Sequence, residues 1–214
     1  MKIQIRSDSV EITGYVNAIE RTSKPLMSRI GRFVERICKG AFSNALKRRD
    51  DVHVLLNHDW SRDLGSTKQG NLELTEDSIG LHARMVSTDP DLIQSARNGD
   101  LVGWSFGFMD VPDGVETGFD SETQLPLRKI RDLDLREVSI LDRTKTPAYE
   151  GTLIMARSDD EDLFISEAMV GEVSISEETE NVREEEQPEQ AEPEANIDYS
   201  IYERWIREMK GESA

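Results

Sequence analysis

Apolar and polar residues alternate over many short stretches of the chain, a pattern typical of strands with one buried face. The alternation occurs in KIQIR and VEITGYV within residues 2–20, where a turn or bulge is expected near Gly14, and in DVHVLLNHD at residues 51–59. Residues 70–86 predict two strands joined at residues 76–78. The segments LVGWSFGFMDV and LPLRKIRDLDLREVSILD predict further strands, so the fold is expected to be mainly β.

Two segments show helical spacing instead. Between Pro25 and Arg49, apolar residues recur every three or four positions, which predicts one or two short helices. The segment DPDLIQSARNGD predicts another, with Asp89 as its N-cap and Gly99 at its end. Many short strands with two helical insertions predict an α+β domain, a closed or nearly closed β-structure with flanking helices, over residues 1–157.

The remainder of the chain has a different composition. Residues 158–197 are rich in Glu, Ser, Gln and Pro, and they bury too little apolar surface to offset the entropy of ordering, so we expect a disordered acidic linker. Residues 198–214 recover amphipathic spacing, which predicts a short C-terminal helix. A helix of about 12 residues is marginally stable alone in water, so we expect it to dock on a partner.

Charge and cysteine content narrow the function. The net charge is −17, and residues 158–214 hold 19 acidic and 4 basic side chains, which leaves 24 acidic and 22 basic before them. This balance argues against nucleic acid as the main partner. Cys38 is the single cysteine, so an intramolecular disulfide and a Cys-rich zinc site are excluded. We find no signal peptide and no long apolar run, so we expect no membrane partner.

Ser105 lies in a G-x-S-x-G match formed by residues 103–107. In α/β-hydrolases such a serine sits on a strand-to-helix elbow and the catalytic histidine follows it in the chain. Here all three histidines precede Ser105, and the chain continues as a strand, so that architecture is excluded. In a strand, Gly103, Ser105 and Gly107 share a bare face on which a peptide could approach the hydroxyl. The alternative is an ordinary strand with glycines around a bulge.

His58 shares strand parity with Val52 and Val54, which places it on an apolar face. A histidine there is either a hydrogen-bonded core residue or a candidate base. His53 and His82 have no comparable placement. Three scattered histidines without cysteine partners predict no metal site.

Glu137 shares parity with Leu133 and Leu135, so in a regular strand its carboxylate would project onto an apolar face. That burial costs several kcal/mol unless the charge is paired, and a histidinium would be a suitable partner. The alternative is a bulge near Arg136 that turns Glu137 to solvent. Asp132 and Asp134 are rival acids.

Four segments in this order and spacing resemble a known family: FVERICKGAFSNAL, VLLNHDWSRDLGSTKQGNLELTEDSIGL, NGDLVGWSFGF and LDLREVSILDRTKTPAY. They resemble the prohead proteases of tailed bacteriophages, capsid maturation serine proteases related to herpesvirus assemblin, over residues 14–152. The resemblance implies an assemblin-like antiparallel β-barrel with flanking helices. It also implies Ser105 as nucleophile, His58 as base and Glu137 as the third member, with Asp134 or Asp132 as alternatives.

The implied activity is that of a cofactor-independent endopeptidase inside the phage procapsid, in the host cytoplasm. Its expected substrates are the scaffolding portion of the capsid protein and the protease itself, with self-cleavage expected after Ser158. A homodimer is a further expectation from the assemblin relation. The competing interpretation is a noncatalytic acidic scaffolding protein of the procapsid. The acidic tail is expected to be either a tether that recruits the protease or an extension removed by self-processing.

Overall fold

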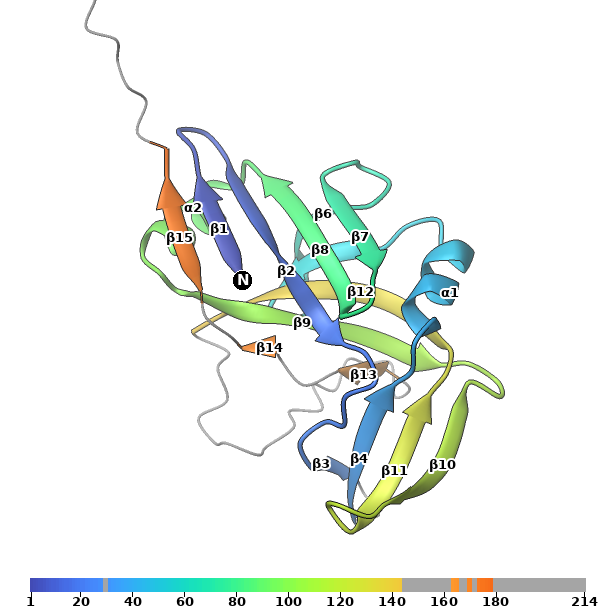
Figure 1. Cartoon of the computed structure of the whole chain (residues 1–214). Coiled ribbons are helices and arrows are strands. Elements are labelled where there is room, and N and C mark those ends of the chain that lie inside the picture. The colour runs from blue at the N-terminus through green and yellow to red at the C-terminus, as the bar shows by residue number, and fades with distance from the viewer. Residues whose placement is uncertain (29–30, 144–162, 166–168, 171–172, 179–214) are drawn as a thin grey trace, which may run out of the picture. The chain divides into compact units, whose positions relative to one another are not determined.

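The computed structural model describes residues 1–28, 31–143, 163–165, 169–170 and 173–178 (Figure 1). Within these ranges the chain forms three β-sheets and two short helices, which confirms the prediction of a mainly β fold. All described residues belong to one compact unit, Met1–Thr179. The helix predicted for residues 198–214, and most of the linker predicted for residues 158–197, lie outside the described residues.

The first sheet has the strand order β15-β1-β2-β8-β7. Its strands are β1 (Lys2–Ile5), β2 (Val10–Ala18), β7 (Leu72–Glu76), β8 (Gly80–Ser87) and β15 (Ser174–Glu177). β15 runs parallel to β1, and the other neighbours are antiparallel. The irregularity predicted near Gly14 is a shift in the β2–β8 register between Tyr15 and Asn17.

The second sheet has the order β10-β11-β4-β3. Its strands are β3 (Leu26–Ser28), β4 (Gly31–Ile37), β10 (Val115–Asp120) and β11 (Leu125–Ile130). Of the one or two short helices predicted between Pro25 and Arg49, only α1 (Ala41–Arg48) is present, and a helix in the first part of this segment was a wrong prediction. Val34 and Ile37 fit a helical spacing, but they are β-branched and pair in register with β11, so tertiary pairing overrides the local pattern.

The third sheet has the order β13-β9-β12-β5-β6, and β14 also pairs with β9. Its strands are β5 (His53–Leu56), β6 (Asp59–Ser66), β9 (Leu101–Asp110), β12 (Leu133–Asp142), β13 (Leu163–Ile165) and β14 (Met169–Val170). β12 is antiparallel to β9 and parallel to β5. Strands β13 to β15 lie in the range for which composition predicts disorder, where backbone pairing with β9 and β1 orders them.

The predicted closed antiparallel barrel is not found in the described residues. Each of the three sheets ends in edge strands, and three of the strand pairs are parallel. Alternation in a sequence reports which face of a strand is buried. It does not report which strand it pairs with, so closure could not be inferred from it.

A hydrophobic core joins the sheets to the two helices. α1 places Phe42 edge-on against Phe106 of β9, with ring centroids 5.2 Å apart. α2 (Pro90–Arg97) begins as predicted, because the Asp89 side chain accepts a hydrogen bond from the Leu92 backbone N–H at 2.8 Å. The contact between Phe42 and Phe106 holds one face of β9 in the core.

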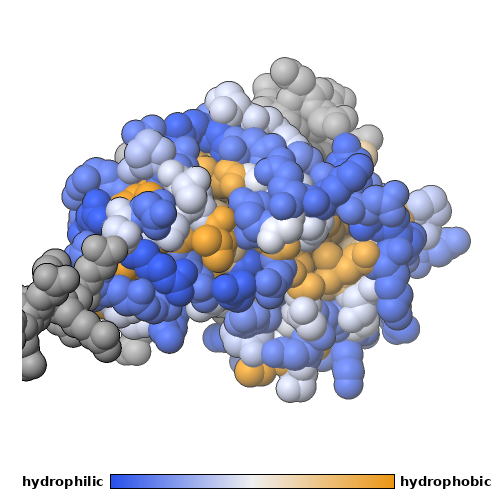
Figure 2. Space-filling model, turned by 90° about the horizontal axis from the view of Figure 1, so that it is seen from above, coloured by the Kyte–Doolittle hydropathy of each residue, from blue (hydrophilic) through white to orange (hydrophobic). Residues whose placement is uncertain are grey.

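The surface seen in Figure 2 is mostly hydrophilic, with separate hydrophobic areas between the charged residues. Five large apolar side chains are exposed in the described residues: Met27, Trp60, Ile79, Phe119 and Ile175. Among the same residues, no helix has the length and apolar character needed to cross a membrane.

Candidate active site

Ser105 and Glu137 lie on the same face of the third sheet. In the antiparallel β9–β12 pair, Ser105 is opposite Ser139 and Gly107 is opposite Glu137. Directly opposed residues of antiparallel strands place their side chains on the same face. Trp104, Phe106 and Phe108 project to the other face, where they join the core as the alternation predicts. The face of Ser105 was expected to be bare, but the serine is only 1% exposed.

A β-bulge in β12 aims Glu137 at this face. Leu135 pairs with Phe108 and Glu137 with the adjacent Gly107, so Arg136 is the extra residue. The bulge reverses the parity of the strand, and Val138 and Ile140 take over the core positions that Leu133 and Leu135 occupy before it. The bulge considered near Arg136 is therefore present. It does not turn Glu137 to solvent, since this residue is 1% exposed.

His58 lies in a tight turn between β5 and β6, so its expected place on a regular strand was wrong. Leu56 pairs with Asp59, which leaves Asn57 and His58 as a two-residue hairpin loop. Both have positive φ, 57° and 60°, as a type I′ turn requires. Asparagine readily adopts this conformation, and histidine adopts it more often than most residues do. Because His58 lies in this turn, the alternation of side chains along β5 does not determine the direction of its imidazole.

The turn is hydrogen-bonded to β12. The Asn57 backbone N–H donates to the Ile140 carbonyl at 2.8 Å, and the Asp142 backbone N–H donates to Asn57 Oδ1 at 3.0 Å. The His58 backbone N–H donates to the Ser139 hydroxyl oxygen at 3.1 Å. These three bonds fix the position of the His58 backbone relative to the strand that carries Glu137.

The His58 side chain is bonded directly to Glu137. Nδ1 of the imidazole lies 2.8 Å from Glu137 Oε1, and the His58 side chain is 14% exposed. Because an ionised carboxylate only accepts hydrogen bonds, an ionised Glu137 requires the proton on Nδ1, and the lone pair of a neutral imidazole is then on Nε2. The second carboxylate oxygen, Oε2, accepts a hydrogen bond from the Ser139 hydroxyl at 2.5 Å. Both oxygens of the buried carboxylate are thus satisfied.

Gly107 makes the position of Glu137 sterically available. A Cβ atom added to Gly107 would lie 2.5 Å from Glu137 Oε1 and 3.3 Å from its carboxyl carbon. The second glycine of the G-x-S-x-G match therefore leaves space for the carboxylate that holds His58. The sequence interpretation had instead given this glycine the role of admitting a substrate backbone.

The rival acids point to other partners. Asp132 Oδ1 accepts from Arg48 at 2.8 Å, and this guanidinium keeps the pKa of Asp132 below its usual range. Asp134 accepts from Arg49 at 2.8 Å. Of the three acids, Glu137 is the one that the structure brings to His58.

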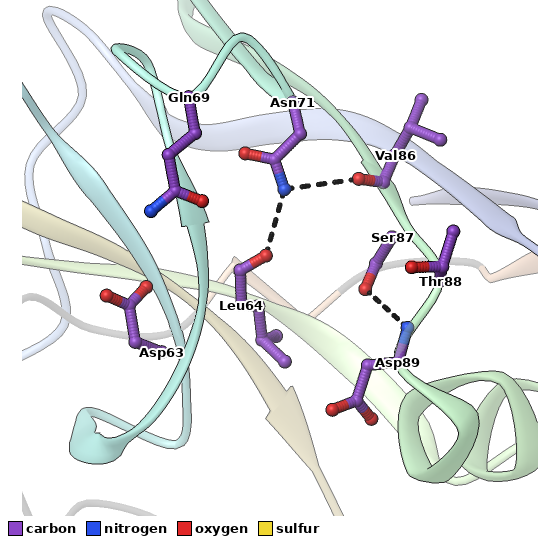
Figure 3. A pocket seen from close by; sticks show the side chains of 8 residues that line it. All are labelled: Asp63, Leu64, Gln69, Asn71, Val86, Ser87, Thr88 and Asp89. Atoms are coloured by element: carbon purple, nitrogen blue, oxygen red, sulfur yellow. Dashed lines mark hydrogen bonds between the residues drawn. The ribbon is translucent and has the colours of Figure 1, made fainter.

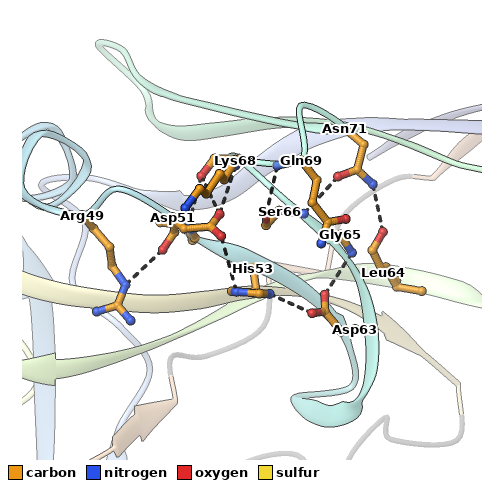
Figure 4. A network of polar contacts seen from close by, with 12 residues as sticks. Arg49, Asp51, His53, Asp63, Leu64, Gly65, Ser66, Lys68, Gln69 and Asn71 are labelled. Carbon is orange, nitrogen blue, oxygen red and sulfur yellow. Dashed lines mark hydrogen bonds and ion pairs between the residues drawn. The ribbon is translucent and has the colours of Figure 1, made fainter.

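The other two histidines are engaged elsewhere. Figure 4 shows His53 between Asp63, 2.8 Å from Nδ1, and Asp51, 3.7 Å from Nε2. His82 packs edge-on against Tyr15, with ring centroids 5.2 Å apart. Among the described residues, no group of three His, Cys, Asp or Glu side chains is arranged to hold a metal ion.

A pocket of about 380 Å³ lies beside the start of α2 (Figure 3). Asn71 crosses it and donates to the carbonyls of Leu64 and Val86 at 2.9 and 3.3 Å. The Asp89 backbone N–H donates to the Ser87 hydroxyl at 3.1 Å. Asn71 thus links β6 to β8. The residues that line the pocket include none of the three candidate catalytic residues.

A comparison with protein-family models places this geometry in context. The model of the caudovirus prohead serine protease family matches residues 1–164. The chain belongs to this family. The match spans β1 to β12 with Ser105, His58 and Glu137, and it confirms the resemblance inferred from the four sequence segments. No curated protein and no solved structure matched the chain.

Sequence reasoning missed Ser139 and the turn at Asn57. A serine that alternates with apolar residues in a strand carries no distinctive signal. The turn had half of the usual signal: asparagine is common at the first position of a two-residue hairpin loop, but the second position usually holds glycine and here holds His58.

We predict that Gly107→Ala slows the reaction of Ser105 with a fluorophosphonate probe at least about a hundredfold, since misplacing a catalytic group by about 1 Å has that effect. Gly118→Ala is the matched control, because a Cβ on this strand glycine meets nothing within 4 Å. Equal labelling rates for the two variants would show that the carboxylate position does not matter.

We predict that Ser139→Val slows the same labelling reaction roughly ten- to a hundredfold while Ser139→Thr largely preserves the rate. The two replacements have nearly the same shape, but only threonine keeps the hydroxyl that bonds Glu137 and His58. Thermal unfolding of both variants controls for packing changes. If the two variants label at one rate, the hydroxyl has no positioning role.

Proposed function

We propose that the protein is the serine endopeptidase that matures a phage procapsid, with Ser105 as nucleophile, His58 as general base and Glu137 as the acid that orients His58. The observation that carries the proposal is the 2.8 Å bond from the buried Glu137 carboxylate to His58 Nδ1. Membership of the prohead serine protease family supports it. Ser105 lies opposite Ser139 on the same sheet face, and the Ser139 hydroxyl accepts a hydrogen bond from the His58 backbone N–H, which supports Ser105 as the hydroxyl that His58 would activate.

The proposed reaction follows the chemistry of acid-base-nucleophile triads. His58 Nε2 takes the Ser105 proton as Oγ attacks the peptide carbonyl, and Glu137 stabilises the imidazolium that forms. The imidazolium then protonates the leaving amine. In the second half of the reaction His58 takes a proton from the attacking water and returns a proton to Ser105 Oγ as the acyl-enzyme is hydrolysed. Backbone N–H groups are the expected donors to the oxyanion. No metal or cofactor takes part in this scheme.

The proposed substrates are the scaffolding portion of the capsid protein and the chain itself, cleaved inside the procapsid in the host cytoplasm. The family description supports a role in prohead maturation. The homodimer, the absence of a nucleic-acid partner and the roles of the acidic tail stay predictions. The competing function, a noncatalytic scaffolding protein, gives no reason for a buried carboxylate bonded to a histidine beside a strand serine.

We predict that co-expression with the capsid protein yields cleaved capsid protein with the unaltered chain and none with Ser105→Ala. Glu137→Gln lowers the cleavage rate by roughly 10²–10⁴-fold, because the imidazole loses the carboxylate that fixes its tautomer. Asp134→Asn is the control and retains cleavage, since Asp134 bonds Arg49. Cleavage that survives Ser105→Ala would overturn the proposal, and equal losses for Glu137→Gln and Asp134→Asn would overturn the assignment of the acid.

A further inference from the structure

The edge of β9 that faces away from β12 pairs with two short strands from later in the chain. β13 is antiparallel to β9, with Leu163 opposite Met109 and Ile165 opposite Gly107. β14 is also antiparallel, with Met169 opposite Trp104. Figure 1 shows both short strands lying along β9.

The register of these two strands brackets the candidate nucleophile. β13 ends opposite Gly107 and β14 begins opposite Trp104, so Ser105 lies between the two paired positions. An extended peptide that adds to a sheet edge is held by main-chain hydrogen bonds. The registers of the two strands differ by one residue. An extended peptide that paired with β9 at both positions would carry its backbone past Ser105, where a bond to be cleaved must lie.

Ser105 is closed to an external substrate in this arrangement. The residue is 1% exposed, whereas a nucleophile must contact the carbonyl carbon that it attacks. A substrate strand could pair with this edge of β9 only after β13 and β14 leave it, because their backbones are paired with the edge.

The chain beyond β14 is fastened to the same compact unit. The Ser174 backbone N–H donates to the Met1 carbonyl at 3.0 Å, and that of Glu178 donates to the Ile5 carbonyl at 2.9 Å. Val173 packs against the hydrophobic core. β14 and β15 lie beyond residues 1–164, which the family model matches. The contacts of β15 with β1 are therefore made by residues outside the matched range.

We propose that this edge of β9 is the binding site for an extended substrate peptide, and that β13 and β14 of the protein's own chain occupy it until a substrate strand displaces them. The cleavage half of this inference rests on the proposed function; the binding half does not. The occupant has apolar residues in both paired pieces, LFI and MV. The substrate class is accordingly an extended peptide with apolar residues on both sides of the cleaved bond.

The test measures binding of a fluorescent peptide with the sequence of residues 160–173, DEDLFISEAMVGEV, to the full chain carrying Ser105→Ala. The edge is opened by adding Phe164→Pro and Ile165→Pro. Successive residues of a strand point their N–H groups to opposite edges, so one of the two prolines removes a donor to β9. The matched control carries Asn181→Pro and Val182→Pro.

The peptide is expected to bind the opened variant at least about tenfold more tightly than the Ser105→Ala chain or the proline control. The reason is that the apparent affinity equals the intrinsic affinity multiplied by the fraction of molecules whose site is vacant. A scrambled peptide is expected to show no such difference. Equal affinity for all three chains overturns the proposal.

A second variant, in which residues 159–170 are replaced by Gly and Ser at the same length, guards against damage by the prolines and is expected to bind the peptide as the opened variant does. Absence of peptide binding by both variants contradicts the proposal. Fluorophosphonate labelling of the Ser105-containing versions is read separately. Failure to label Ser105 in the two opened variants overturns the proposed function. The binding result in the Ser105→Ala background separately decides whether β13 and β14 occupy the peptide site.

Discussion

A buried carboxylate has to be paired, because an isolated charge in the interior costs several kcal/mol. Glu137 meets this requirement with His58 Nδ1 on one oxygen and the Ser139 hydroxyl on the other. The surrounding structure serves this pairing: the bulge at Arg136 turns the side chain to the correct face, and Gly107 leaves the space that the carboxylate occupies. The candidate nucleophile lies on the strand that this glycine belongs to.

β9 connects the core to the candidate chemistry. One face carries Trp104, Phe106 and Phe108 into the core, where α1 packs on Phe106, so the strand cannot shift without disturbing the interior. The other face presents Ser105 toward the residues of β12. One edge is bonded to β12 and the other to β13 and β14, so the candidate nucleophile and the proposed peptide site lie on the same strand.

Strand parity predicted much of this from the sequence, and its failures have physical causes. It separated Ser105 from the aromatic face and marked Glu137 as an unusual acid. It misplaced His58, because Asn57 and His58 form a turn with positive φ that interrupts the alternation. Strand parity could not predict pairing between distant strands. β4 pairs with β11 although its sequence has a helical spacing, and β13 pairs with β9 although it lies in an acidic region. Ser139 stayed hidden because its role comes from its contacts with Glu137 and His58.

The tautomer of neutral His58 tests the central claim most directly. NMR of the protein labelled with ¹⁵N at histidine reports which ring nitrogen carries the proton, and the signal absent from His58→Gln identifies the residue. The 2.8 Å bond to Glu137 predicts a protonated Nδ1 and an unprotonated Nε2 available to Ser105. A proton on Nε2 in the neutral ring would contradict the role assigned to Glu137 and, with it, the account of His58 as the base.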